Sequence, residues 1–164
     1  MTVGSLGQFN AATTAPNGNI IVVGTSHSLS SVFSVSSVLA EIDQNGELVT
    51  YWSHQYESLL SFNAIAPMPD GGYAIAGSAG SDNEDALVLV VRDLAEMNNP
   101  GFLVWQKTFG GSGEDSFDSI AVDKNGDIVV GGSTTSTDGT LPHSDGSRDA
   151  VVLKLTAGGD LVPR

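Results

Sequence analysis

The stretch FDSIAVDKNGDIVVGGST, residues 117–134, places two short β-type runs on either side of an Asn-Gly pair. Asn125-Gly126 is a strong hairpin signal, because glycine adopts a positive φ without steric cost. Isoleucine and valine fill the runs, and no helical period is present in them. The stretch therefore predicts an antiparallel hairpin that ends at a glycine.

Two further copies of this stretch precede it in the chain. FNAATTAPNGNIIVVGTS begins at Phe9 and FNAIAPMPDGGYAIAGSA begins at Phe62, so the copies start 53 and 55 residues apart. Such a spacing fits the repeats of propeller blades, which run to about 40–50 residues plus loop variation. Each copy has a turn glycine and then a strand-end glycine, which allows close backbone approach. These pairs are Gly18 and Gly24, Gly71 and Gly77, and Gly126 and Gly132.

Two more β-rich runs follow the hairpin of each repeat. The predicted third strands are Ser37–Ile42, Ala86–Val91 and Ala150–Leu155, and the predicted fourth strands are Leu48–Trp52 and Leu103–Phe109. Residues 93–98 lie at an expanded turn, where we expect an irregular conformation, with a single helical turn as the alternative. Because one small sheet cannot bury both of its faces, we expect the repeats to stack. The predicted fold is an all-β propeller of four-stranded antiparallel blades, three blades per chain.

The repeats divide the chain into blades at about 1–56, 57–111 and 112–160, within a propeller fragment of 1–160. Residues 161–164, Leu-Val-Pro-Arg, match the remnant of an engineered thrombin site, and we exclude them from fold reasoning. Residues 1–8 have neither the basic nor the apolar region of a signal peptide. We therefore expect a native signal or anchor to lie outside this sequence.

The segment from Trp105 to Val122, together with Asn125-Gly126 and residues 149–155, DAVVLKL, resembles the bacterial β-propeller repeat family called SBBP. Clostridial surface-protein repeats are of the same style. The likeness spans almost the whole chain and is weakest in the first repeat, where Thr50 stands in the place of Trp105. It implies a propeller fold and export to the extracellular space or cell surface. It implies no particular ligand and no catalytic residue.

Charge and composition limit the partners. The chain has 164 residues, with 19 acidic against 6 basic side chains and a formal charge of −13. Nucleic-acid binding requires clustered Lys and Arg, and an anionic membrane repels such a chain, so we expect neither partner. No apolar run reaches the ~18 residues of a membrane-spanning helix. Cysteine is absent, which excludes disulfides and thiolate chemistry.

Three blades are fewer than propellers use, since known rings have about 4–8 blades. Two chains related by a two-fold axis would supply six, and we expect a homodimer of this kind. Its joining faces are predicted to contain Ile20, Val22, Val151 and Leu153, with residues 1–5 beside the partner's last blade. The alternative is a slice of a longer propeller whose edges stay exposed.

Aromatic and acidic residues are the candidate binding sites. Trp52, Tyr56, Trp105 and His143 are candidate ligand-binding residues, because exposed aromatic rings stack on sugars. Alternation sends Tyr51 and Trp52 to opposite faces, one into the core. Acidic loops cluster the oxygen ligands that Ca²⁺ prefers, and Asp82, Asp85, Asp145 and Asp149 are the candidate metal ligands. Loop solubility, with Asp85 and Asp149 capping a strand end, is the favoured explanation of these acids, so Ca²⁺ is possible but not favoured, and no other cofactor is expected.

No catalytic constellation is present in the sequence. The histidines lack metal-binding spacing, and no nucleophile elbow or phosphate loop occurs. We expect a non-catalytic extracellular module that binds a glycan or protein partner or acts as a surface scaffold. A purely structural spacer or self-association unit is the alternative. A glycoside-active propeller enzyme is a distant one, because its paired carboxylates would have to meet at one site.

Overall fold

The computed structural model describes residues 8–27, 35–54, 60–141 and 144–163, and these form an all-β molecule of three antiparallel sheets. The first sheet contains β1 (Gln8–Thr14), β2 (Ile20–His27), β3 (Val35–Ile42) and β4 (Leu48–His54). The second contains β5 (Leu60–Pro67), β6 (Tyr73–Ala79), β7 (Asp85–Val91) and β8 (Leu103–Phe109). The third contains β9 (Asp115–Val122), β10 (Ile128–Thr134) and β11 (Asp149–Leu155).

Each sheet is a meander in which every strand pairs with the next one along the chain. The predicted third strands lie within β3, β7 and β11, and the two predicted fourth strands lie within β4 and β8, so these predictions are confirmed. The third sheet has three strands, and the segment after β11 adds an isolated bridge between Leu155 and Leu161. The sequence predicted four-stranded blades, with the fourth strand of the third blade only begun at Leu161-Val162, and the described part of this sheet has three strands.

The three predicted hairpin turns join the first and second strands of the sheets. At the last of them the Gly126 N–H donates to the Asp123 carbonyl at 3.0 Å, and Gly126 has φ +87°. Gly18 and Gly71 have the same left-handed conformation, at φ +83° and +95°. Only glycine adopts this conformation without strain, which is why the turn residue recurs in each repeat.

One prediction about a turn is wrong. Residues 93–98 were expected to be irregular, but Leu94–Glu96 form a single 3₁₀ turn, η1. The Asp93 side chain accepts a hydrogen bond from the Ala95 N–H at 2.8 Å and so caps the turn. An aspartate cap satisfies a backbone donor that a short turn leaves unpaired, and Leu94 adds burial to it. No described helix is long and apolar enough to span a membrane.

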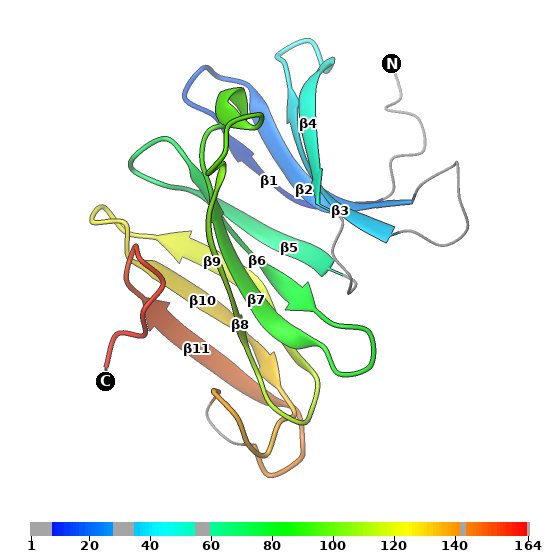
Figure 1. Cartoon of the computed structure of the whole chain (residues 1–164), viewed down its shortest axis with the longest axis vertical. Helices are drawn as coiled ribbons and strands as arrows, with labels where there is room; N and C mark the ends of the chain where they lie inside the picture. The colour runs from blue at the N-terminus through cyan, green and yellow to red at the C-terminus, as the bar shows by residue number, and fades with distance from the viewer. Residues whose placement is uncertain (1–7, 28–34, 55–59, 142–143, 164) are drawn as a thin grey trace.

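The three sheets stack face to face in chain order (Figure 1). β5 contacts β1, β2 and β3, and β9 contacts β5, β6 and β7, so the first strand of each sheet covers the sheet before it. Two apolar cores result. The core between the first two sheets contains Phe62, Tyr73 and Leu39, and the core between the last two contains Phe117, Ile128 and Val88.

Candidate functional site

Two faces of the stack lie at its ends. The first strand of each sheet has a phenylalanine, and we call the face that contains it the leading face. In the second and third sheets this face packs against the preceding sheet. The opposite face, which packs against the following sheet, is its trailing face. Within the described residues, the leading face of the first sheet and the trailing face of the third sheet have no sheet stacked on them.

The leading end face exposes side chains that the other two sheets bury. Phe9 is 39% exposed, whereas its repeat equivalents Phe62 and Phe117 are both 0% exposed. Ile20 is 38% exposed, and its equivalents Tyr73 and Ile128 are at 1% and 0%. The centre of the face is covered, since Val22, Val38 and Ala40 form a small buried cluster. Its apolar rim is therefore what remains in contact with solvent.

The trailing end face shows the same contrast. Val152 is 56% exposed, and its equivalents Leu39 and Val88 are at 0%. Val129 is 37% exposed, whereas its equivalents Ile21 and Ala74 are at 1% and 0%. The end faces thus carry the residue types that form the two internal cores.

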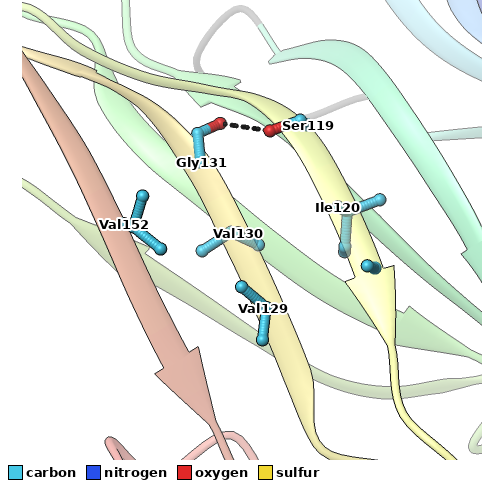
Figure 2. A pocket seen from close by; sticks show the side chains of 7 residues that line it. Ser119, Ile120, Val129, Val130, Gly131 and Val152 are labelled. Atoms are coloured by element: carbon cyan, nitrogen blue, oxygen red, sulfur yellow. Dashed lines mark hydrogen bonds between the residues drawn. The ribbon is translucent and has the colours of Figure 1, made fainter.

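A shallow hollow of about 210 Å³ lies on the trailing end face. Its lining residues are Ser119, Ile120, Ala121, Val129, Val130, Gly131 and Val152. Figure 2 shows Val152 on β11 beside the strand that carries Gly131 and Val129, and the Ser119 hydroxyl donates to the Gly131 carbonyl at 3.1 Å. The positions equivalent to Gly131 hold Val23 and Ala76 in the other sheets. The missing side chain therefore helps to form the hollow.

The prediction that Val151 and Leu153 belong to an end face is wrong. Both are buried, at 3% and 8% exposed, in the core between the second and third sheets. Successive side chains of a strand point to opposite faces, so Val152 takes the end face instead. β11 is apolar at 151, 152 and 153, and the signal that the prediction missed is Lys154, which lies on the same side of the strand as Val152. Ile20 lies exposed on the leading end face, as predicted, whereas Val22 on the same face is buried.

Asparagine side chains join the first strands of consecutive sheets. The Asn10 Nδ2 donates to the Phe62 carbonyl at 2.8 Å, and the Asn63 Nδ2, at the same repeat position, donates to the Phe117 carbonyl at 3.2 Å. The third repeat has Asp118 at this position. An ionised carboxylate has no donor for a carbonyl, so this bond cannot recur beyond the third sheet at neutral pH.

The two tryptophans pack against the turn of the following sheet. The Trp52 ring lies 5.2 Å from that of Phe102 in an edge-on arrangement. The Trp105 Nε1 donates to the Ala157 carbonyl at 2.9 Å, and its ring packs against Gly159. Tyr51 is 52% exposed while Trp52 contacts the core, so the predicted alternation is confirmed. Tyr56 and His143 lie outside the described residues.

The candidate metal ligands are placed separately. Asp82 is exposed in the turn between β6 and β7, and Asp145 and Asp149 are exposed before and at the start of β11. The Ser147 side chain and N–H hold the pKa of Asp145 below its usual value. Asp85 is half-buried. Within the described ranges, no three His, Asp or Glu side chains lie close enough together to hold a metal ion.

Surface charge on the trailing end face is paired within the sheet. The Lys154 Nζ lies 2.9 Å from Asp127 Oδ2 and 3.4 Å from Asp123 Oδ2, and these hydrogen bonds raise the pKa of Lys154. Hydrogen bonds from Asn125 and Asp127 N–H lower the pKa of Asp123. The carboxylates of Asp123 and Asp127 therefore bind Lys154, and Asp123 also accepts hydrogen bonds from the backbone of its own turn.

No model of a known protein family matches this chain, and no curated protein matches it significantly.

Proposed function

We propose that the chain is a non-catalytic β-propeller module of the extracellular space or cell surface that works as a scaffold by self-association. Two copies close one ring of six blades, in which the exposed rim of each leading end face, with Phe9 and Ile20, packs on the trailing end face of the partner. The observation that carries this proposal is the repeat equivalence of the end faces. Phe9 and Val152 are exposed at positions where each internal junction buries an apolar side chain.

The internal junctions supply the model for the closing contact. In them the phenylalanine of one sheet packs in a core with the second- and third-strand residues of the preceding sheet. By the same geometry Phe9 of one copy would meet the hollow around Gly131 of the other. Burial of apolar surface drives association, at about 25 cal/mol per Å² before the entropy of association is subtracted. A front-to-back contact that closes on itself gives a finite ring.

Protein binding through sheet faces is favoured over glycan binding. Trp52 and Trp105, the candidate sugar platforms, are half-buried and packed against neighbouring turns. A stacking platform for a sugar requires an exposed aromatic face. The acidic composition and the resemblance to exported propeller repeats support the extracellular location.

Light scattering coupled to size exclusion tests this proposal. The chain has a mass of 16.9 kDa, and at micromolar concentration we expect about twice that mass. Because each copy carries −13, the measurement should be made at ~0.5 M NaCl, where repulsion between surface charges is screened.

The Val152→Asp substitution should convert the dimer to a folded monomer, because it places a charge in the apolar contact. Val104→Asp is the matched control. Val104 is 49% exposed on β8 of the middle sheet, away from both end faces, so this variant should remain dimeric. A folded, monodisperse wild-type monomer would refute self-association. The end faces would then be expected to pack against further blades of a longer chain.

A further inference from the structure

Two carboxylates from different sheets converge beside Gly110. Asp85 is the first residue of β7 and Asp115 is the first residue of β9. A Cβ built on Gly110 would overlap both Asp85 Oδ1 and Asp115 Oδ2, so the two oxygens are near neighbours across a position that lacks a side chain. Burial and the charge of Asp115 raise the pKa of Asp85. The two groups therefore interact across the junction between the second and third sheets.

Asp115 is a buried carboxylate with half of its hydrogen-bonding capacity unused. The residue is 1% exposed. Its Oδ2 accepts from the Ser136 hydroxyl at 2.7 Å and the Gly111 N–H at 3.1 Å, but its Oδ1 is buried and has no hydrogen-bond partner among the described residues. An unpaired buried oxygen of a charged group is costly, and such groups in native proteins are usually paired or bound to a cation.

The junction supplies no positive charge to this pair. Arg148 forms its ion pair with Glu114, at 3.4 Å, and donates to the Ser133 hydroxyl at 2.9 Å. In the described part of the chain, no Lys or Arg forms an ion pair with Asp85 or Asp115. The buried Oδ1 of Asp115 and its like-charged neighbour Asp85 both favour a cation at this junction.

We propose that Asp85 and Asp115 bind one Ca²⁺ ion, which joins the second and third sheets. Ca²⁺ takes carboxylates, hydroxyls and waters in irregular geometry, whereas Mg²⁺ demands a near-ideal octahedron. Two protein carboxylates leave the remaining positions to water. The site shares Asp85 with the acidic loop singled out in the sequence, but its second ligand is Asp115 and not Asp82.

The repeats provide matched comparisons for this site. At the junction between the first two sheets, the positions equivalent to Asp85 and Asp115 hold Ser36 and Leu60, so the pair belongs to one junction alone. The third repeat has Asp149 at the position of Asp85, and Asp149 is exposed. Asp149→Asn is therefore a control that removes the same charge from the same repeat position.

Calorimetric titration of EDTA-treated protein with CaCl₂ tests the proposal, together with thermal unfolding in Ca²⁺ and in Mg²⁺ at matched ionic strength. We expect one Ca²⁺ per chain and a rise of several degrees in melting temperature, because a ligand of the folded state stabilises it. Mg²⁺ should give a much smaller rise. Asp85→Asn should lose both the binding heat and the shift, and Asp149→Asn should keep both.

Three results would overturn the site: no binding heat at millimolar Ca²⁺, an undiminished shift in Asp85→Asn, or loss of the shift in Asp149→Asn.

A proton shared by Asp85 and Asp115 would produce another pattern. Because the folded pKa of Asp85 is raised, the metal-free chain gains stability as the pH falls through that pKa towards 3.8, the ordinary pKa of an aspartate. If this gain disappears in Asp85→Asn while Ca²⁺ has no effect, the pair holds a proton and the calcium proposal fails.

Discussion

Gly24, Gly77 and Gly132 show why single residues recur in this chain. Each lies opposite the phenylalanine of the first strand, where the register shifts by one residue. A Cβ at Gly77 would overlap the carbonyl oxygen of Ser61, and the other two glycines meet the equivalent carbonyls. A bulge brings the strands close together at this point, so a side chain here would push the first strand away.

Gly77→Ala should lower the free energy of unfolding by at least about 2 kcal/mol, because the overlap is with backbone that cannot rotate away. Urea denaturation measures the change. Gly158→Ala is the control, since its nearest atom to a new Cβ is Thr156 Oγ1 at 3.8 Å. That variant should stay within about 0.5 kcal/mol of wild type. Equal losses in the two variants would refute the close-approach explanation.

At the scale of the strand, one sequence position has two structural outcomes. Phe9, Phe62 and Phe117 occupy equivalent places in β1, β5 and β9. Phe117 lies 5.8 Å from the Phe109 ring within the core between the second and third sheets. Phe9 faces no sheet among the described residues. The phenylalanine has the same position in all three strands. It is fully buried only where a preceding sheet covers it.

Phe117→Ala should cost about 3–5 kcal/mol of stability, the usual range for a buried phenylalanine. Phe9→Ala should cost less than about 1 kcal/mol in the monomer, because the ring is already partly in water. Denaturation at a protein concentration low enough to dissociate dimers measures both values. A large loss for Phe9→Ala in the monomer would mean that this ring belongs to a core of its own chain.

At the scale of the molecule, the stack has a direction. At both internal junctions, the leading face of one sheet packs against the trailing face of the sheet before it. A contact between copies that follows the same order joins unlike faces. A symmetric contact of two leading or two trailing faces would instead join like faces. The two arrangements respond differently to substitutions placed on one face.

Phe9→Asp places a charge on the leading end face, and Val152→Asp places one on the trailing end face. If unlike faces join, each variant alone should be monomeric. An equimolar mixture should form a heterodimer with one intact contact, which native mass spectrometry resolves after isotope labelling of one variant. If like faces join, one of the two variants alone will remain a dimer. That result would contradict the front-to-back ring while leaving self-association intact.

The sequence by itself determined the repeat, the hairpin turns at Gly18, Gly71 and Gly126, and the meander of short strands, because turn glycines and β-branched runs act locally. It also determined that Tyr51 and Trp52 point to opposite faces. Alternation from Lys154 indicates that Val152 and not Val151 lies on the exposed side of β11, and tertiary structure alone decided that this side is an end face of the stack. It alone revealed Asp115 as buried. The residue shares a strand face with Phe117 two positions later, but only the stacking of β9 on the second sheet covers that face.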